Sequence, residues 1–339
     1  MGMTLRVGIS GYGLAGRYFH APLLKAAGFE VVGILTMNEE RKRHALADFP
    51  KVKIADSLPE LLDMGLDLFV VASANMAHAS DAVAGLKRKV PVVIDKPMGR
   101  NENETRAIID VAHENGTTVS TYFNRLFDSD ALTVKKALAE GVLGEVFRLD
   151  SRFERFRPIS NPNSWRETMS ASNGGGNLLD LGPHLVSLAL SWFGPAEVTY
   201  ASVRSIRGQA DDDIVINLKH EGGVDSYLSA SAIIGADGPR IRLSGNNGSL
   251  VIQDLDSQET RLRLGEYPEN GTWNPHAITP AFIHRGDAVT PYPGAAGNYS
   301  LFYSKVASAI TSNSPWPVTC EEALAVAKIL DNARRLSIR

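Results

Sequence analysis

The sequence contains a single cysteine, Cys320, among its 339 residues. One cysteine excludes a disulfide within the chain and any metal site built from several cysteines. Free cysteine is usually buried, so we interpret Cys320 as structural. The sequence also has no group of histidines and carboxylates with the spacing of metal ligands, so we expect no metal ion.

Long apolar runs are also missing. No run approaches the roughly 18 residues needed to cross a membrane, and the start MGMTLRVGISGYG lacks the basic and apolar regions of a secretory signal. We therefore expect a cytoplasmic protein with no membrane partner. The formal net charge of -3 leaves no basic surplus, so we expect no nucleic-acid partner.

The length predicts two domains, since one domain usually holds about 100–200 residues. Up to residue 123, short apolar β-branched runs alternate with helical patterns, which is typical of a doubly wound α/β Rossmann domain with a parallel sheet. The run LFVVAS is apolar on both faces and belongs at the centre of that sheet. The predicted strands are Leu5–Ser10, Glu30–Thr36, Val52–Ala55, Leu66–Ser73, Val90–Asp95 and Thr117–Tyr122, and the helices include Leu58–Met64, Ala77–Lys87 and Glu104–Asn115.

Residues 124–339 are predicted to form an α+β domain with one large, mostly antiparallel open sheet, because turn signals such as EGG and GNNG separate several strand-like segments. The Pro- and Gly-rich stretch Tyr267–Gly297 is predicted to be a long loop, either functional or poorly ordered. The predicted helices are Ala131–Glu140, Asn298–Thr311 and Glu321–Leu336, and the strands are Glu145–Phe156, Glu197–Arg207, Ile214–His220, Val224–Ile233, Arg240–Ser244, Ser249–Gln253 and Thr260–Leu264.

The motif GYGLAG follows the first strand and opens a helix. Its glycines suit a tight turn, a close approach of a pyrophosphate and helix-against-strand packing, with phosphate held at the helix N-terminus. The alternative is an ordinary glycine-rich turn that binds no ligand. The strand before the motif and the alternation of strands and helices after it favour a dinucleotide site. The expected cofactor-binding residues are Gly11, Tyr12, Gly13, Leu14, Ala15 and Gly16.

The end of the second strand bears on the choice of cofactor. An Asp or Glu there would bind the adenine ribose hydroxyls of NAD, whereas this chain has Thr36, followed by Asn38 and Arg41. A missing carboxylate with nearby cations favours the 2′-phosphate of NADP over NAD. Alternatively, the basic run Arg41 to Arg43 is a solvent-exposed helix face that does not contact the cofactor.

The tripeptide DKP, Asp95 to Pro97, ends the apolar strand VPVVI. Ligands of open parallel sheets bind beyond the carboxyl ends of the strands, so Lys96 is expected beside a nicotinamide, where its ammonium can stabilise charge on a reacting oxygen. Pro97 is a candidate for a cis peptide bond. The alternative is a surface lysine paired with Asp95.

The segment GGGNLLDLGPHLVSLAL places Asp180 and His184 four residues apart. If a helix begins near Asp180, Pro183 falls in its tolerated first turn and the two side chains share one face. A carboxylate beside an imidazole suits a general base. A capping Asp and a structural His are the alternative.

These four signals, in this order and spacing, resemble the Gfo/Idh/MocA oxidoreductases over essentially the whole chain. The resemblance implies that Lys96, Asp180 and His184 are catalytic, with His184 as acid/base on a substrate hydroxyl. It implies that Ser73, Asn75 and His78, in the stretch SANMAH, lie beside the nicotinamide with Asp95, Lys96 and Pro97; alone, His78 would be a helix-surface histidine. It also implies a homodimer or homotetramer formed through the open sheet.

The stretches GYGLAGRYFHAPLL, NRLFDSDALTVKKALAEGVLGEV and FERFRP are similar to the NADP-dependent scyllo-inositol dehydrogenase subgroup. That similarity implies a cyclic polyol or sugar as substrate. Two positions depart from the family pattern, since Asp95 replaces the usual Glu and Ser187 stands where many members have Asp. Without the resemblance, Arg125 would be a surface ion pair with Asp128 and Asp130. The substrate-binding residues implied are Asn124, Arg125, Phe153, Arg157 and Trp165.

The sequence thus predicts an NADP-dependent oxidoreductase that transfers hydride between a secondary alcohol of an inositol-like polyol or sugar and the nicotinamide. Two alternatives stay open. One is a regulator that binds the cofactor without catalysis, and the other is a sugar-active enzyme whose cofactor stays bound and is recycled.

Overall fold

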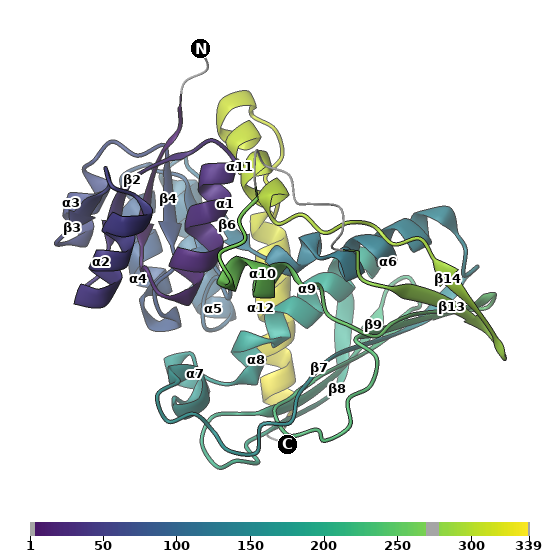
Figure 1. Ribbon diagram of the computed structural model, residues 1–339. Helices are drawn as coiled ribbons and strands as arrows, with labels where there is room; N and C mark the ends of the chain where they lie inside the picture. Colours follow the sequence, from purple (N-terminus) through teal and green to yellow (C-terminus); the bar gives the residue numbers. More distant parts are fainter. Residues whose placement is uncertain (1–3, 269–277, 338–339) are drawn as a thin grey trace. The chain divides into compact units, whose positions relative to one another are not determined.

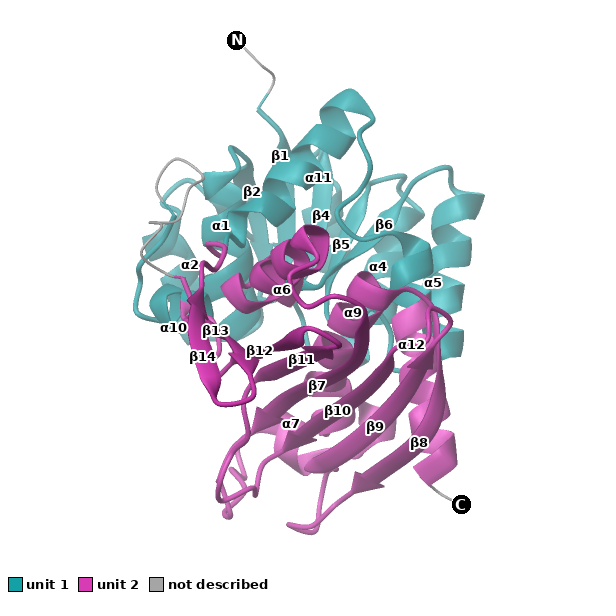
Figure 2. Ribbon diagram, turned by 90° about the vertical axis from the view of Figure 1, so that its right-hand side faces the viewer, with its two compact units in different colours: residues 1–124, 258–274, 298–324 teal, residues 125–257, 275–297, 325–339 magenta. Residues whose placement is uncertain are grey.

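The computed structural model describes residues 4–268 and 278–337, and the described chain divides into two compact units (Figures 1 and 2). The first unit contains residues 4–124, and the second begins at Arg125, close to the predicted boundary after residue 123. The prediction assigned all later residues to the second domain, whereas in the structure the later segments are divided between the two units. Residues 258–268 and 298–324 pack with the first unit, whereas 278–297 and 325–337 belong to the second.

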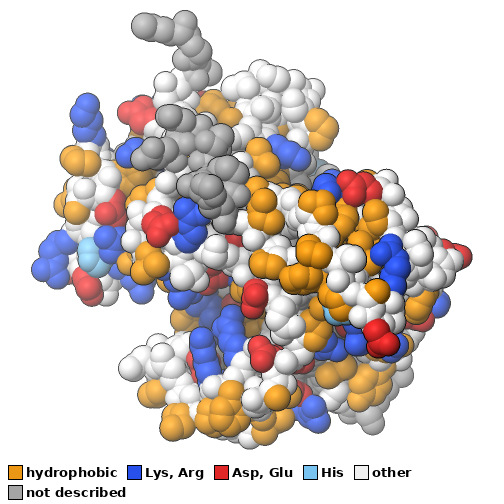
Figure 3. Space-filling model, turned by 45° about the vertical axis from the view of Figure 1, so that its right-hand side comes forward, with side chains coloured by type: hydrophobic (Ala, Val, Ile, Leu, Met, Phe, Trp, Pro, Cys, Tyr) orange, Lys and Arg blue, Asp and Glu red, His pale blue; other side chains and the backbone are white. Residues whose placement is uncertain are grey.

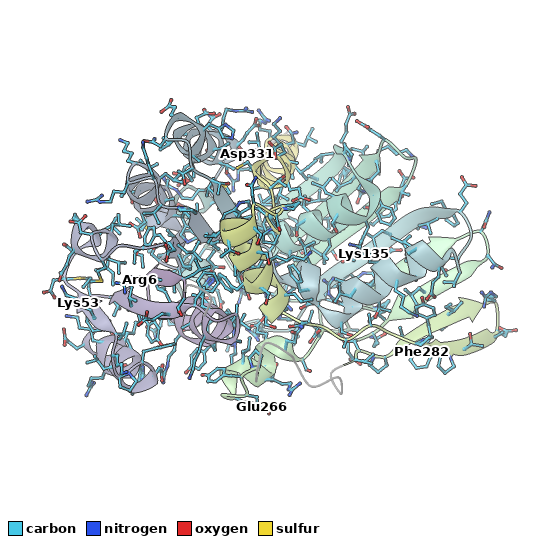
Figure 4. The ribbon with its side chains drawn as sticks, turned by 90° about the horizontal axis from the view of Figure 1, so that it is seen from above. Arg6, Lys53, Lys135, Glu266, Phe282 and Asp331 are labelled. Carbon is cyan, nitrogen blue, oxygen red and sulfur yellow. The ribbon has the colours of Figure 1, made fainter. Side chains whose placement is uncertain are left out.

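The first unit contains a six-stranded parallel sheet in the order β3-β2-β1-β4-β5-β6, which confirms the predicted Rossmann architecture. All four residues of β4 are buried, as expected for a strand covered on both faces. The strands are β1 (Arg6–Ser10), β2 (Glu30–Leu35), β3 (Lys53–Ala55), β4 (Leu68–Val71), β5 (Val92–Asp95) and β6 (Val119–Tyr122), with Lys53 labelled at the start of the edge strand in Figure 4.

Helices connect these strands, and side-chain caps fix where several of them begin. Asn38, Ser57 and Asn101 each accept a hydrogen bond from the backbone N–H three residues ahead. Such caps satisfy amide groups that the first helical turn leaves without partners. The helical segments are η1 (Gly16–His20), α1 (Ala21–Ala26), α2 (Glu39–Asp48), α3 (Leu58–Leu62), α4 (Asn75–Leu86), α5 (Glu102–Glu114), α10 (Gln258–Arg263) and α11 (Ser300–Ser312). Two more, η2 (Asn124–Phe127) and α12 (Cys320–Ser337), begin in this unit and continue into the second.

The second unit contains an eight-stranded sheet in the order β14-β13-β12-β11-β7-β10-β9-β8 (Figure 2). Only β7 and β10 pair in parallel, and the other neighbours are antiparallel, which confirms the predicted large and mostly antiparallel sheet. The strands are β7 (Val146–Glu154), β8 (Ala196–Arg204), β9 (Asp213–His220), β10 (Asp225–Ser231), β11 (Ile241–Gly245), β12 (Gly248–Ile252), β13 (Ala281–Arg285) and β14 (Ala288–Tyr292).

Helices α8 and α9 of this unit contact the central strands β7, β9 and β10. In Figure 2 the opposite face of the sheet is turned toward the viewer, with these helices behind it. The exposed side of α6 includes Lys135, labelled in Figure 4, whereas Val134 and Ala137 are buried. The helical segments are α6 (Ser129–Glu140), α7 (Trp165–Thr168), η3 (Ala171–Asn173), α8 (Asn177–Asp180) and α9 (Gly182–Phe193).

Two sequence predictions in the C-terminal third were wrong. The segment Thr260–Leu264 alternates polar and apolar residues and was predicted as a strand, but it lies mostly in helix α10. An i,i+4 ion pair of 2.8 Å between Glu259 and Arg263 favours the helix, and Leu262 is its fully buried apolar residue. Five residues are too few for alternation alone to distinguish the two structures.

The second error is the stretch Tyr267–Gly297, predicted as a long loop. Strands β13 and β14 form a hairpin within it, turning at Gly286 with φ of 61°. The alternating apolar residues Ala281 and Ile283 are buried, and Phe282 lies on β13 (Figure 4). Residues 269–277 of the predicted loop lie outside the described residues.

None of the helices among residues 4–268 and 278–337 is both long enough and apolar enough to cross a membrane. On the face drawn in Figure 3, basic and acidic side chains are interspersed with hydrophobic ones rather than gathered by sign.

Candidate active site

The glycine turn after β1 has the geometry that a dinucleotide requires. Gly11 has a φ of 92°, and a Cβ there would lie 2.5 Å from the carbonyl oxygen of Ala72. A Cβ on Gly16 would collide with the carbonyl oxygen of Gly11, so the helix can approach the strand only with glycine at this position. A Cβ on Gly13 would meet only the guanidinium of Arg41, at 3.5 Å. The cradle therefore fits a pyrophosphate held close to backbone amides.

The neighbouring side chains of the turn differ in their surroundings. Tyr12 is buried, and its hydroxyl donates a 3.0 Å hydrogen bond to Asp48, which also pairs with Arg17 at 2.8 Å. Burial, followed by the charge of Asp48, raises the pKa of Tyr12. Leu14 is exposed and Ala15 half-buried, so the turn presents backbone and small apolar surface outward.

The residues after β2 gather beside this turn. The amide of Gly11 donates to the carbonyl oxygen of Leu35 at 2.8 Å, which ties the turn to the end of β2. Thr36 is buried, and Asn38 caps α2 by accepting a 3.0 Å hydrogen bond from the amide of Arg41. The cap places Arg41 in the first turn of α2, with its guanidinium beside Gly13.

The loop after β4 joins the loop after β5 through His78. Its Nδ1 lies 2.8 Å from the carbonyl oxygen of Pro97, and its Nε2 lies 3.1 Å from the carbonyl oxygen of Ser73. The interpretation of His78 as a helix-surface residue is excluded, since only 1% of it is exposed. Asn75 is also buried, at the start of α4, and Ser73 donates to Asp81 at 3.0 Å.

Lys96 follows the carboxyl end of β5, and the peptide bond between Lys96 and Pro97 is cis, as the sequence suggested. The Lys96 amide donates a 2.9 Å hydrogen bond to the buried carboxylate of Asp95. Burial raises the pKa of Asp95, but hydrogen bonding and charge from His20, with the charges of Lys96 and His78, outweigh it and lower the pKa below its usual value. Asp95 therefore supplies a negative charge directly beside Lys96.

Sequence reasoning missed His20, which lies in η1 after the glycine turn. The His20 side chain is fully buried, its Nδ1 lies 2.6 Å from the hydroxyl of Tyr303, and its Nε2 lies 3.8 Å from Asp95. No local pattern could reveal this, because Tyr303 is 283 residues away along the chain.

The sequence suggests a helix start near Asp180 with Pro183 in its first turn, and the second unit has this start, but Asp180 itself lies outside the helix that carries His184. Asp180 ends α8 and α9 begins at Gly182, with Pro183 in its first turn. Pro183 lacks an amide hydrogen, so the helical ladder is interrupted between the two residues. The Asp180 carboxylate accepts a 3.2 Å hydrogen bond from Arg166, a partner that sequence reasoning also missed.

His184 is buried near Phe153, with ring centroids 6.1 Å apart. Phe153 in turn lies 5.4 Å from the guanidinium carbon of Arg125, which pairs with Asp128 at 3.1 Å. The alternative of a surface ion pair is excluded, because the Arg125 side chain is only 4% exposed. Ser187, where many family members have Asp, donates to the carbonyl oxygen of His184 at 3.2 Å.

The structure also gives the surroundings of the other three predicted substrate residues. Asn124 is buried at the start of η2 in the first unit. Arg157 is exposed, and its carbonyl oxygen accepts a 3.0 Å hydrogen bond from Arg207. Trp165 begins α7 and carries the guanidinium of Arg166 over its ring at 4.4 Å. Among the described residues, no group of three or more His, Cys, Asp and Glu side chains could hold a metal ion.

Comparison with known families assigns both parts of the chain. Residues 5–123 match the oxidoreductase family with an NAD-binding Rossmann fold, and residues 131–251 match a GFO/IDH/MocA C-terminal domain. The chain belongs to the Gfo/Idh/MocA oxidoreductases. Within this family it is 32% identical to scyllo-inositol 2-dehydrogenase (NADP(+)) of Bacillus subtilis, over 98% of this chain and 94% of the relative.

Other Gfo/Idh/MocA proteins are similar along the full chain. The oxidoreductase YdgJ of Escherichia coli is 31% identical over 98% of this chain and 96% of its own length. The solved structure of an oxidoreductase from Yersinia pestis superposes with a TM-score of 0.89 and 31% identity, covering 100% of this chain and 96% of that one. The resemblance predicted from the motifs is thereby confirmed.

Proposed function

We propose that this protein is an NADP-dependent dehydrogenase or reductase that interconverts a secondary alcohol and a ketone on a cyclic polyol or sugar of the inositol type. One observation carries the proposal. Lys96 follows β5 at the same sheet edge as the Gly11–Gly16 turn after β1, and its amide is bonded to a buried Asp95 whose pKa is lowered. A cation beside a dinucleotide cradle suits stabilisation of charge on a reacting oxygen.

The bound nicotinamide supplies hydride acceptance or donation. In the direction of oxidation, the Lys96 ammonium polarises the substrate oxygen and orients the substrate. His184 accepts the hydroxyl proton, and Asp180, which ends the short helix before α9, completes the proposed catalytic set. In the direction of reduction the same groups act in reverse, with His184 returning the proton.

The preference for NADP is proposed from the residues at the end of β2. Thr36 offers no carboxylate to the ribose, and Arg41 places a cation beside Gly13. A guanidinium can donate two parallel hydrogen bonds to the charged oxygens of a phosphate. The ribose of NAD has only neutral hydroxyl groups at this place, so it would bind the guanidinium more weakly. The Bacillus subtilis relative is named as an enzyme of NADP and scyllo-inositol, in agreement with both parts of the proposal.

The proposal is tested by turnover of the purified protein with NADP or NAD over a panel of inositols and sugars. Lys96→Met should lower kcat by about a hundredfold or more, as expected for loss of an oxyanion-stabilising group. Its affinity for NADPH should change little. Lys135→Met on the exposed side of α6 is the matched control and should turn over like the wild type.

The outcomes separate the remaining alternatives. No turnover over the panel together with tight NADPH binding would favour a cofactor-binding regulator. Substrate conversion without net oxidation or reduction of free NADP would favour a bound and recycled cofactor. Near-normal turnover of Lys96→Met would contradict the assigned role of Lys96.

We further propose that the protein acts in the cytoplasm as a homodimer or homotetramer assembled through the open face of the eight-stranded sheet. Phe147, Tyr200 and Phe282 are each at least 38% exposed and lie on strands of that sheet. Large apolar groups on one surface favour association. Light scattering of the purified protein should give a mass of two or four chains.

A further inference from the structure

A buried ionic cluster surrounds Phe153 in the second unit. The guanidinium carbon of Arg240 lies 3.9 Å from the centroid of the Phe153 ring, closer than that of Arg125. Arg240 also lies 3.3 Å from the carboxylate of Asp130, and the two side chains are 4% and 0% exposed. A desolvated guanidinium this close to an aromatic face is strongly attracted to it.

Several hydrogen bonds hold Arg240 in this place. Its Nη1 donates to the hydroxyl of Ser151 at 2.7 Å and to the carbonyl oxygen of Arg152 at 3.2 Å. These partners and Phe153 are consecutive residues of β7, and the carbonyl oxygen of Arg240 accepts from the amide of Arg152. The guanidinium is therefore anchored to the same strand whose ring it covers.

Burying two arginines here requires compensating charge. Asp128 pairs with Arg125, Asp130 pairs with Arg240, and Asp256 accepts from the backbone amide of Ser129 between those two carboxylates. Burial raises the pKa of Asp130, although the two arginines oppose this. A cluster of this kind costs desolvation and contributes little net stability compared with apolar packing, so stability alone does not account for two arginines beside the Phe153 ring.

We propose that Arg240 is a positioning residue that holds the Phe153 ring against the imidazole of His184. The proposal rests on the proposed function, because it assumes that His184 moves the substrate proton. The Phe153 ring lies at 59° to the imidazole, so it limits how far the imidazole can tilt on that side. Without Arg240 the Phe153 ring can move more, and the imidazole of His184 is no longer packed against a ring of fixed position.

A double-mutant cycle in turnover tests this directly. Arg240→Met should lower kcat by about tenfold, since small displacements of a catalytic group are costly, while the affinity for NADPH is retained. Phe153→Leu should give a similar loss. If Arg240 acts through the ring, Arg240→Met in the Phe153→Leu background should lower kcat no further. Arg240→Lys keeps a cation over the ring and should recover part of the loss.

The control is Arg242→Met on β11, which loses an ion pair of 3.1 Å with Asp150 but has 43% of its side chain exposed. It should leave kcat within about twofold. Because Arg240→Met leaves Asp130 buried without this cation, the pair Asp130→Asn with Arg240→Met removes both charges and serves if the single variant does not fold. Losses of kcat that multiply in the cycle, or normal kcat in a folded Arg240 variant, would overturn the proposal.

A readout independent of turnover separates this proposal from the proposed function. The imidazole signal of His184 in proton–carbon NMR spectra, assigned by its loss in His184→Gln, reports the ring current of Phe153. Arg240→Met should shift that signal and Arg242→Met should not. If the wild type turns over no polyol or sugar, the proposed function fails, and an unshifted signal would separately reject positioning by Arg240.

Discussion

The imidazole of His78 bridges two loops at the carboxyl edge of the parallel sheet, with Nδ1 2.8 Å from the carbonyl oxygen of Pro97. Its Nε2 faces a second carbonyl oxygen, that of Ser73, at 3.1 Å. A charged imidazolium would donate to both, whereas a neutral ring donates to one. Burial dominates and lowers the pKa of His78, even though Asp95 and the two carbonyl groups act in the opposite direction.

This relationship predicts a loss of stability in weak acid. Because the folded protein binds the His78 proton less readily than the unfolded chain does, the unfolded chain gains protons first as the pH falls through the ordinary pKa of 6.5. Stability is then fully present above that pH and declines below it. Burial lowers the pKa of His220 as well, so both residues contribute in the same direction.

Thermal unfolding at pH 7.5 and pH 5.5 checks this prediction. His78→Gln should lower the midpoint at pH 7.5 and reduce the difference between the two pH values. His113→Gln, at an exposed position of α5, should behave like the wild type. An equal pH difference in His78→Gln and the wild type would contradict the assignment.

Substitution of Gly16 in the glycine turn is expected to cause a steric clash, not only a strained backbone conformation. Gly16→Ala places a methyl group against the carbonyl oxygen of Gly11, which must move the cradle that holds the pyrophosphate. We expect a loss of about 1–3 kcal/mol in the free energy of unfolding, typical of overpacking, and a loss of NADPH affinity of about tenfold or more.

Gly28→Ala is the control for this substitution. Gly28 has a φ of 84°, but a Cβ added there would have no other atom within 4 Å, so alanine strains only the backbone. It should reduce stability without changing NADPH affinity. Fluorescence titration of NADPH separates the two variants, and unchanged affinity in Gly16→Ala would count against a cofactor at this turn.

Arg41 is predicted to set the cofactor preference. Arg41→Ser removes the cation beside Gly13 and should weaken NADP binding by about tenfold, the loss of one charge-assisted contact of roughly 1.4 kcal/mol. NAD affinity should change little. Arg43→Ser, exposed two residues further along α2, is the matched control. A parallel loss of NAD and NADP affinity in Arg41→Ser would contradict a contact with the 2′-phosphate.

The sequence predicts the first unit well because parallel strands buried on both faces leave uninterrupted apolar runs such as β4. It fails where contacts are distant or segments short. The five residues Thr260–Leu264 alternate like a strand, yet Leu262 is buried from a helix. The roles of His20 and Arg240 depend on contacts with residues distant in the sequence. His20 contacts Tyr303 and Asp95, and Arg240 contacts Phe153.

The last prediction concerns the Tyr303 hydroxyl, which lies 2.6 Å from Nδ1 of His20. Tyr303→Phe removes this one oxygen and leaves a buried ring nitrogen without its partner, which should cost about 1–3 kcal/mol of stability. Because His20 lies 3.8 Å from Asp95, and Asp95 accepts from the amide of Lys96, a looser His20 should also lower kcat severalfold. Cofactor affinity should be retained.

Tyr267→Phe, at an exposed position after α10, controls for loss of a hydroxyl group as such. Chemical unfolding and steady-state kinetics of the two variants should therefore differ in both stability and kcat. If Tyr303→Phe were as stable and as active as Tyr267→Phe, His20 would not depend on Tyr303. A loss of stability with an unchanged kcat would confine the role of the Tyr303 hydroxyl to folding and remove His20 from the support of Lys96.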